Sequence, residues 1–368
     1  MQAAPLPLIR NRLHWRALRY ALSLAGPLFG WLAFTQYGLH TWGMVLFSFV
    51  LVPVLDLLLR PDHGNLSQLE AEMAVKEPLF DLLLYVLVPV HWALLLLFLS
   101  GMDDPLLAPL DRAGRIATMG LLCGIYGINL AHELGHRANR WERDLARVLL
   151  LSSLYMHFII EHNRGHHRRV ATPEDPASAC FGESVYAFWV RSIVFSAASA
   201  WRIERERMLK AGLSTWHWRN EMLQAILIQV TLLAFIAAVF GLFPLGAFVG
   251  AALIGILLLE TVNYIEHYGL RRTKGAQGGY GRVRHWHSWN SDHPVGRLML
   301  FELTRHSDHH YKASKKYQVL ESHDEAPELP TGYPGMMLLS LVPPLWRAVV
   351  HPRLEKLVAM HDDLELAV

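Results

Sequence analysis

The sequence predicts an all-α integral membrane protein: a bundle of six transmembrane helices with a histidine-rich site for two metal ions at its cytoplasmic end and further helices at the membrane interface. Three observations lead to this fold class. Hydrophobic residues make up 52% of the 368 residues and charged residues 18%, a balance nearer to membrane proteins than to average soluble domains. Several apolar runs are long enough to cross a bilayer, which takes about 20 residues. The 21 histidines gather in a few short segments.

The apolar runs give the expected order of elements within a single domain, residues 1–368. We expect the six spans at 18–37, 41–59, 78–100, 116–131, 222–240 and 245–262. The short gaps between the first and second spans and between the last two would form turns between antiparallel helices. Shorter or more amphipathic stretches at 145–160, 185–200 and 336–350 are expected at the interface or beneath the bundle. The first residues lack the pattern of a cleavable signal peptide, so none is expected.

Basic residues set the expected orientation, because cytoplasmic segments of membrane proteins are enriched in Lys and Arg. Four arginines lie between residues 10 and 19, whereas the loop between the third and fourth spans is acidic. We therefore expect a cytoplasmic N-terminus, six crossings and a cytoplasmic C-terminus. Residues 132–221 and 263–368 would then form a cytoplasmic cap that contains every histidine cluster.

Nine histidines fall in four segments at the ends of the fourth and sixth spans and in the cap. They are His132, His136, His162, His166, His167, His267, His306, His309 and His310. Residues three or four apart on a helix share a face, with Cβ atoms about 5–6 Å apart. This spacing occurs in the pairs His132–His136 and His162–His166 and in the trio His306, His309 and His310. We expect the side chains in each of these sets to converge on a metal ion.

The chemistry of the imidazole side chains limits which metals can bind. Imidazole suits Fe, Zn, Cu and Ni, and nine nitrogens are too many for one ion, so they suit two. The chain has two cysteines, Cys123 and Cys180, which cannot form a disulfide framework. Because no cysteine lies in the histidine segments, a structural zinc site with thiolate ligands is not indicated.

Polar residues beside the histidines are expected to orient the ligands. A metal-bound histidine usually donates its other N–H to a carboxylate or a similar group. The candidates beside the histidines are Glu133, Glu161, Glu266 and Asp308. Glu260 and Asn263 share a helical face with His267 and are expected to support the site as well. The alternative for each carboxylate is an ordinary solvated surface pair.

Two other classes of protein compete with this interpretation. His132 to His136 reads HELGH, the pattern of zinc proteases with Glu133 as general base, so an intramembrane zinc protease is a rival. That rival leaves the other histidine segments without a joint purpose. A metal transporter fits less well, because the predicted ligands lie at the cytoplasmic ends of the spans. The net charge of +2 does not indicate a nucleic-acid partner.

At this point the sequence resembles the membrane-bound alkane 1-monooxygenases, within the superfamily of membrane di-iron desaturases and hydroxylases. The resemblance covers residues 50–350 approximately. It rests on HELGH at 132–136, EHNRGHH at 161–167 with VATPEDPASA at 170–179, NYIEHYGL at 263–270 and HSDHH at 306–310. The sequence differs from the family pattern at Thr304, at Tyr311 and Lys312, and at Asp292 and His293. These differences leave the nine histidines intact and bear on local shape, partner docking and substrate.

The resemblance implies a specific activity and specific partners. It implies two iron ions (Fe2+/Fe3+) held by the nine histidines, and hydroxylation of the terminal carbon of medium- to long-chain n-alkanes with O2. Electrons would come from NADH through a rubredoxin reductase and a rubredoxin, in the inner membrane of a bacterium. No Cys-x-x-Cys pair is present, so we expect no rubredoxin fused to this chain. A desaturase or a lipid hydroxylase would share the fold and the irons and is a further alternative.

Three smaller hypotheses concern single residues. Ser48, between two phenylalanines of the second span, is a candidate substrate-channel position where a larger side chain would limit chain length; the alternative is an ordinary small residue at a helix contact. Asp56 and Arg60 are four residues apart and are expected to form an ion pair at the interface. Histidines outside the nine are not expected to be ligands; His285, His287 and His293 are interpreted as loop residues or neighbours of a substrate gate.

The cytoplasmic face is expected to be basic. The residues concerned are Arg137, Arg140, Arg168, Arg169, Arg271, Arg272, Lys312, Lys315 and Lys316. Such a surface would steer an acidic electron-transfer protein towards the metal site. The alternative is the usual cytoplasmic enrichment of basic residues, in contact with lipid headgroups.

Overall fold

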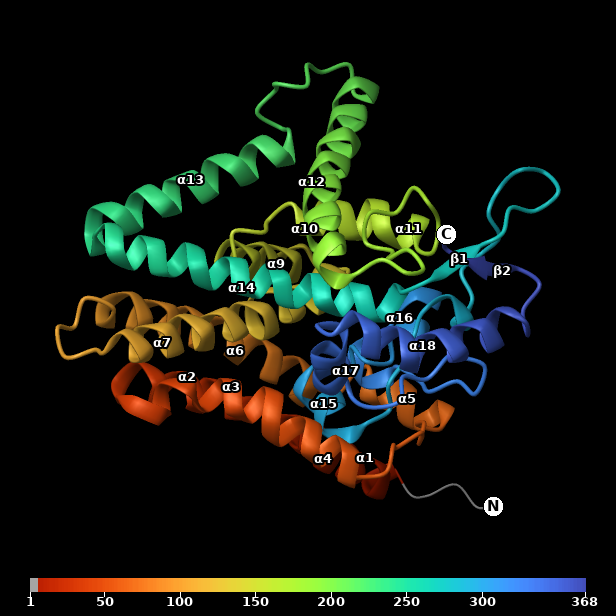
Figure 1. Cartoon of the computed structure of the whole chain (residues 1–368), viewed down its shortest axis with the longest axis horizontal. Helices are drawn as coiled ribbons and strands as arrows, with labels where there is room; N and C mark the ends of the chain where they lie inside the picture. The colour runs from red at the N-terminus through yellow and green to blue at the C-terminus, as the bar shows by residue number, and fades with distance from the viewer. Residues whose placement is uncertain (1–5) are drawn as a thin grey trace.

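The computed structural model describes residues 6–368, and their regular secondary structure is almost entirely helical (Figure 1). Long helices extend towards the left of Figure 1, and short helices gather at the opposite end together with the one sheet of the described residues. This sheet pairs β1 (Leu270–Arg272) antiparallel with β2 (Leu364–Leu366), with Leu270 opposite Leu366. The arrangement confirms the helical fold class.

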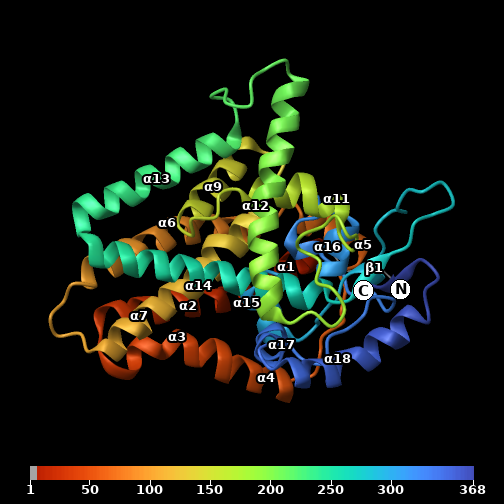
Figure 2. The ribbon, with the colours of Figure 1, turned by 45° about the horizontal axis from the view of Figure 1, so that its top comes forward.

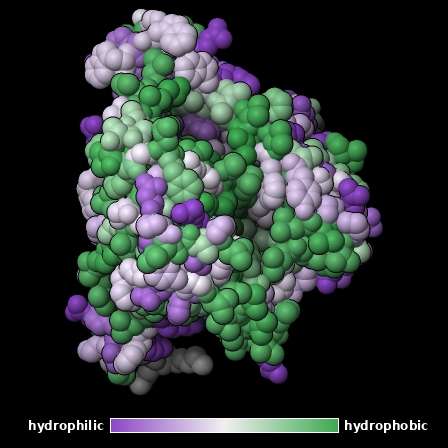
Figure 3. All heavy atoms as spheres, turned by 60° about the vertical axis from the view of Figure 1, so that its left-hand side comes forward, coloured by the Kyte–Doolittle hydropathy of each residue, from purple (hydrophilic) through white to green (hydrophobic). Residues whose placement is uncertain are grey.

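Five helices are long and apolar enough to cross a membrane. They are Leu6–Thr35, Gly38–Leu58, Pro78–Gly101, Glu221–Phe240 and Leu242–His267. Many of their large apolar side chains are exposed: Leu57 and Leu227, for example, expose 72% and 68% of their surface. Figure 3 brings the left-hand side of Figure 1 forward and shows hydrophobic side chains over much of that face. Exposed apolar surface on this scale fits contact with lipid, and the chain is a multi-pass membrane protein.

In Figure 1 these helices carry several labels, because short 3-10 and π segments interrupt them. The first comprises α1 (Leu6–Arg19), η1 (Tyr20–Leu24) and α2 (Ala25–Thr35). The second comprises η2 (Gly38–Trp42), α3 (Gly43–Leu46), η3 (Phe47–Leu51) and α4 (Val52–Leu58). The others are α6 (Pro78–Gly101), α13 (Glu221–Phe240) and α14 (Leu242–His267). The first helix starts earlier than expected, because the arginine-rich stretch continues it as α1.

One of the six expected spans, the fourth (116–131), is not among these five. It lies in a helix formed by α7 (Pro109–Leu122), the π-helix η4 (Cys123–Asn129) and α8 (Leu130–Gly135). Every residue from 118 to 135 is buried, so this helix is enclosed by protein where the other spans expose apolar surface. Gly124 lets α14 approach closely, since a Cβ there would come within 2.5 Å of Leu258. The helix lies at the centre of the bundle, and most of its polar side chains are buried in the protein interior.

The remaining elements form the cap and an arm. They are α5 (Gln68–Ala74), α9 (Arg140–Leu151), α10 (Phe158–Glu161), η5 (His162–His166), α11 (His167–Arg169), α12 (Val185–Lys210), η6 (His285–His287), α15 (Pro294–Met299), α16 (His306–Tyr311), η7 (Tyr317–Val319), α17 (Tyr333–Ser340) and α18 (Pro343–Val358). Helix α12 runs ten residues beyond the expected 185–200 and stands away from the bundle as an arm (Figure 2). The expected 145–160 stretch divides between α9 and α10, and 336–350 divides before Pro343.

The expected ion pair between Asp56 and Arg60 does not form. Asp56 is 1% exposed and turns inward, where its Oδ1 accepts a hydrogen bond of 3.2 Å from the backbone N–H of Val295 at the start of α15. Arg60 is exposed and has no ion-pair partner within residues 6–368. The prediction was wrong because Asp56 bonds an unpaired N–H of a helix start, a favourable acceptor site for a carboxylate.

Candidate metal centre

The nine predicted histidines come together in two groups. In each group every residue offers one nitrogen, and these nitrogens all lie within 4.8 Å of one another. The first group contains His132, His136, His162, His167 and His309, and the second contains His166, His267, His306 and His310. They come from α8, from η5 and α11, from the end of α14 and from α16. Two groups of this kind match two ions.

The pairing within the groups differs from the helical spacing expected above. His162 and His166 fall in different groups, and His162 shares its group with His167. The reason is the π-helix η5 (His162–His166), whose i→i+5 hydrogen bonding turns residues five apart to one side. His309 also separates from His306, which groups with His310 instead. Helix α16 therefore supplies ligands to both groups.

Distances in the first group fit a shared ion. The Nε2 atom of His167 lies 2.9 Å from that of His162 and 3.1 Å from those of His136 and His309. Imidazole nitrogens bind a first-row metal such as zinc at about 2.0–2.1 Å, so two at right angles lie about 3 Å apart. The Nε2 atom of His132 is buried without a hydrogen-bond partner. A metal ion would satisfy it.

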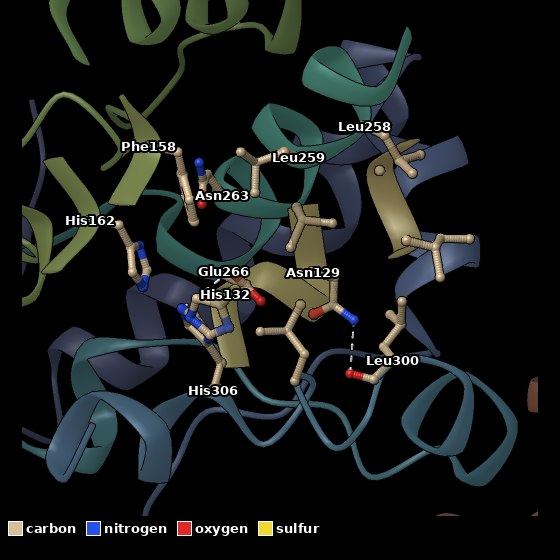
Figure 4. A pocket seen from close by; sticks show the side chains of 14 residues that line it. Asn129, His132, Phe158, His162, Leu258, Leu259, Asn263, Glu266, Leu300 and His306 are labelled. Atoms are coloured by element: carbon tan, nitrogen blue, oxygen red, sulfur yellow. Dashed lines mark hydrogen bonds and ion pairs between the residues drawn. The ribbon is translucent and has the colours of Figure 1, made fainter. Parts of the chain in front are cut away.

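The second group has the same spacing. The Nε2 atom of His310 lies 2.8 Å from that of His306 and 3.2 Å from that of His166, and His306 lies 3.2 Å from His267. Glu266 also enters this group: its Oε2 lies 3.2 Å from the same Nε2 of His306, and its Oε1 is buried without a partner. Figure 4 shows Glu266, His132 and His306 meeting at the centre of the site. Glu266 is therefore placed to bind a metal, and it does not orient His306 through the second ring nitrogen, because Nδ1 of His306 is buried without a hydrogen-bond partner.

Burial keeps most of these imidazoles neutral. It lowers the pKa of His136 to about 4 and holds the pKa of His162 and His309 well below the ordinary value. Neutral imidazole is the form that binds metals, so the ligands need no deprotonation at pH 7. His166 differs: burial lowers its pKa, but the carboxylate of Asp175 outweighs this effect and raises it.

Asp175 is the contact that sequence reasoning missed. Its Oδ2 lies 2.9 Å from Nδ1 of His166, the carboxylate–histidine pair that orients a metal ligand, and it is 2% exposed. The residue stands inside the string VATPEDPASA quoted for the family resemblance, nine residues after the histidine. Adjacency to a histidine was the criterion used above, and Asp175 does not meet it. Similarly, Ser288 Oγ lies 3.4 Å from Nδ1 of His267.

The predicted carboxylates, Glu266 excepted, bond elsewhere. Glu133 pairs with Arg137 at 2.8 Å, and Asp308 pairs with Lys315 at 2.8 Å. Glu161 pairs with Arg169 and also accepts the backbone N–H of His166 at 3.1 Å. They brace the segments that carry the histidines without touching an imidazole of the two groups.

Glu260 and Asn263 lie one step behind the histidines. Asn263 donates to Oε2 of Glu260 at 3.3 Å, and the hydroxyl of Tyr155 donates to Oε1 at 2.9 Å. Asn263 faces the cavity of Figure 4, together with His162.

An apolar cavity leads to the centre. It is lined by Phe158, Leu259 and Leu303 among others, and by His132 and His306 at its inner end (Figure 4). A second apolar cavity reaches Ser48, which is 8% exposed. The two share the lining residues Ile125, Leu258, Val262 and Leu300. We refer to these two adjacent cavities, which lie between the second membrane span and the histidines, as the apolar path.

The loop histidines stay outside both groups. His285 stacks on His323 with ring centroids 3.8 Å apart, and both lie beside Asp308. His293 contacts Ser291, and His287 is buried near Asp363.

Comparison with known proteins agrees with this geometry. Residues 113–339 match the sequence profile of the fatty acid desaturase family. The chain is 39% identical to alkane 1-monooxygenase 1 of Pseudomonas aeruginosa over 352 residues, which are 94% of this chain and 91% of that protein. The chain belongs to the alkane 1-monooxygenase family. It is also 38% identical to the alkane 1-monooxygenase of Ectopseudomonas oleovorans over 331 residues, 89% of this chain and 82% of that one.

A more distant relative widens the range of substrates among similar proteins. The xylene/toluene monooxygenase hydroxylase component XylM of Pseudomonas putida is 28% identical over 337 residues, 90% of this chain and 87% of that protein. Family membership makes this chain a membrane monooxygenase that hydroxylates alkanes, and it confirms the resemblance inferred from the histidine strings. The zinc protease and the transporter are thereby set aside.

Proposed function

We propose that the enzyme hydroxylates the terminal carbon of medium- to long-chain n-alkanes at two irons held by the nine histidines. The observation that carries this proposal is the position of the two histidine groups at the inner end of an apolar path. Iron bound there would supply the activation of O2 and the oxidation of an unactivated C–H bond. The polypeptide supplies the ligands, their orientation and the binding of the substrate.

The residues of the chain bind the metals, orient the histidine ligands and exclude water from the site. Asp175 and Glu266 face His166 and His306, and all four side chains are nearly inaccessible to solvent. A fixed imidazole orientation spares reorganisation when the metal binds. Exclusion of bulk water protects a strongly oxidising centre from side reactions.

An alkane has no polar group, so only shape and apolar contact can hold it. The path from Ser48 to the histidines offers leucine, isoleucine, valine and phenylalanine side chains. Each buried methylene contributes about 0.8 kcal/mol. An extended chain along this path would place one end at the histidines, which favours attack at the terminal carbon.

The proposed topology has six crossings of a bacterial inner membrane, with both termini in the cytoplasm. The helix that contains 116–131 would be the remaining crossing, fourth in chain order, and it packs against the first, second, third and last of the others. Its support is the position of the histidines and of the cap helices α15 to α18 at one end of the long helices (Figure 1). The turn at Gly241 and the α6–α7 loop lie at the other end.

The proposed electron donor is a rubredoxin, itself reduced by NADH through a reductase. Its support is a basic groove of about 900 Å³ beside η5 and α11, the segments that carry three of the histidines. The groove is lined by Arg164, Arg168, Arg169, Arg202, Arg207, Lys210, Arg272 and Arg282, against Glu174 and Glu206. Arg164, Arg169 and Arg207 pair with Glu204 or Glu161, so the net positive charge comes mainly from the other basic residues. A small acidic redox protein matches this charge.

This groove replaces the broader basic face expected from the sequence. Arg137 is 6% exposed and pairs with Asp81 and Glu133, so it cannot meet a partner. Lys315 and Lys316 are likewise engaged in ion pairs with carboxylates.

Product analysis tests the proposed function. The purified chain, loaded with iron and supplied with a reductase, a rubredoxin, NADH and 18O2, is offered a series of n-alkanes. We expect 1-alkanols that carry one 18O atom. Alkenes would assign a desaturase, hydroxylated acyl lipids a lipid hydroxylase, and the absence of any oxidised product would contradict the proposal.

A further inference from the structure

A second small cavity lies behind the histidines, on the far side of Phe158 and Asn263 from the apolar path. It measures about 20 Å³, enough for one water molecule. It shares Phe158, Asn263 and His162 with the apolar cavity, so the two spaces meet at the site. A larger share of its lining residues is polar than in the substrate path; they include Tyr155, His157, Glu161, Ser196 and Glu260.

Glu260 is the unusual member of this cavity. It is 1% exposed, and within residues 6–368 no Arg, Lys or His nitrogen lies within 4.0 Å of its carboxyl oxygens. Its hydrogen bonds come from uncharged groups, the hydroxyl of Tyr155 and the amide of Asn263. An ionised carboxylate buried without a cation is strongly disfavoured, so the neutral acid is the stable form.

A buried neutral acid beside an oxygenase centre can supply a proton to the reaction. Hydroxylation follows RH + O2 + 2 e− + 2 H+ → ROH + H2O, so each turnover consumes two protons. The substrate path cannot deliver them, because its lining beyond the histidines is apolar. The cavity beside Glu260 can, through a water molecule held among its polar lining residues, which include Glu260, Asn263 and Ser196.

We propose that Glu260 is the internal proton donor of the enzyme and that it acts through the water-sized cavity bordered by Asn263. This inference rests on the proposed function. The carboxyl group of Glu260 releases one of the two protons, through the cavity water, to the water that forms, and becomes a carboxylate; reprotonation of Glu260 from solvent supplies the second proton. The electrons come from the external redox protein named above.

The cavity also gives a route for regaining the proton. Glu161 lines it and pairs with Arg169, which borders the solvent-filled basic groove. The titratable side chains that share the cavity with Glu260 are Tyr155, His157, Glu161, His162 and His166. The cavity thus lies on the side of the histidines that faces the basic groove, apart from the apolar substrate path.

Infrared spectroscopy tests the protonation directly and does not need iron. The full chain in detergent, before and after iron loading, is compared with Glu260→Gln in H2O and in D2O. We expect a band from a protonated carboxyl C=O that shifts in D2O and is missing from Glu260→Gln. A wild-type spectrum without a band of this assignment would overturn the proposal.

The second test measures turnover, with Glu142→Gln as the matched control. Glu142 is also buried and also accepts from a tyrosine hydroxyl and an asparagine amide, those of Tyr85 and Asn139; it differs in having a nitrogen of Arg137 at 4.0 Å and in lining none of the cavities described above. General acid catalysis contributes typically 10²–10⁴-fold, so we expect Glu260→Gln to lose about 10²-fold in alcohol formation and to release peroxide. Iron content and substrate binding stay as in the wild type.

The outcomes separate this inference from the proposed function. Glu260→Asp, which keeps an acidic proton, should recover coupling of O2 use to alcohol, and Glu142→Gln should stay coupled. Full coupling in Glu260→Gln, or loss of iron from that variant, would overturn the proton-donor role while hydroxylation by the wild type still stands. A wild type that makes no alcohol would refute the proposed function instead.

Discussion

Asp175 acts on the centre through a single hydrogen bond, which makes it a direct test of ligand orientation. Its carboxylate lies 2.9 Å from Nδ1 of His166. Removal of such a partner typically lowers metal affinity 10–100-fold. We therefore expect Asp175→Asn to bind iron about 10–100-fold more weakly, measured by competition with a chelator. Asp308→Asn is the control, because Asp308 is equally buried but bonds to Lys315, and its iron affinity should change much less.

Ser48 tests the substrate path at the level of one side chain. It lines the apolar cavity that continues to the histidines. Replacement by tryptophan would fill this cavity, so Ser48→Trp should shorten the longest alkane accepted, whereas Ser48→Ala should leave the range unchanged. Gas chromatography of products from an alkane series measures this range. An identical range in the tryptophan variant would remove Ser48 from the path.

Single residues show what the sequence can and cannot provide. The nine histidines were identified from their clustering, because metal ligands of one type must recur close together in the chain. Their division into two groups was not predicted, since helical spacing assumes an α-helix and η5 is a π-helix. Asp175 was missed because a loop, and not a helical turn, brings it back to His166.

At the level of elements, the arm α12 depends on one buried carboxylate. Glu204 is fully buried and pairs with Arg164 at 2.6 Å and with Arg207 at 2.7 Å, and it accepts the N–H of Glu221 at the start of α13. It thereby ties together the π-helix of the site, the arm and a membrane span. Hydrogen bonds to charged groups contribute about 1.5–3 kcal/mol, so we expect Glu204→Gln to destabilise the fold by about that amount.

The pH dependence of this contact has a defined sign. Burial raises the pKa of Glu204, but hydrogen bonds and charge from Arg207 outweigh this and lower it below 4.5 in the folded protein. A depressed folded pKa stabilises the fold above the unfolded pKa and loses that effect as pH falls. In thermal unfolding, the gap between wild type and Glu204→Gln should shrink from pH 7 towards pH 4. A gap that widens on acidification would contradict this.

Hydropathy predicted four of the long apolar helices closely, placed the start of the first too late, and predicted the fourth span only in part. The stretch 116–131 is apolar enough to suggest a span, yet it is enclosed by other helices, and sequence alone does not distinguish lipid contact from protein contact. Hydropathy underestimated the length of α12, because its second half is rich in charged residues and most of them face solvent.

The whole molecule presents its basic groove next to the histidine segments, which predicts how electrons arrive. Reversal of charge at exposed groove residues, as in Arg168→Glu combined with Arg202→Glu, should slow reduction by an acidic rubredoxin at low salt. The effect should fade at high salt, because screening weakens interactions between exposed charges. Arg140→Glu, exposed but outside the groove, is the control.

Stopped-flow reduction measures these rates. A small neutral reductant should reduce all variants equally, since it needs no docking. Rates with rubredoxin that do not depend on salt or on the groove charges would contradict docking there. Preferential binding of the wild type to anionic vesicles, lost in the groove variants, would assign the groove to lipid headgroups.

Metal analysis of the purified full chain tests the central claim most directly, that the two histidine groups each hold one iron. We predict two irons per chain and less than one-tenth as much zinc. Alanine at His136 should remove iron from the first group and alanine at His310 from the second, with about one iron left in each variant. A wild type that binds a single metal ion, or zinc in place of iron, would contradict the account.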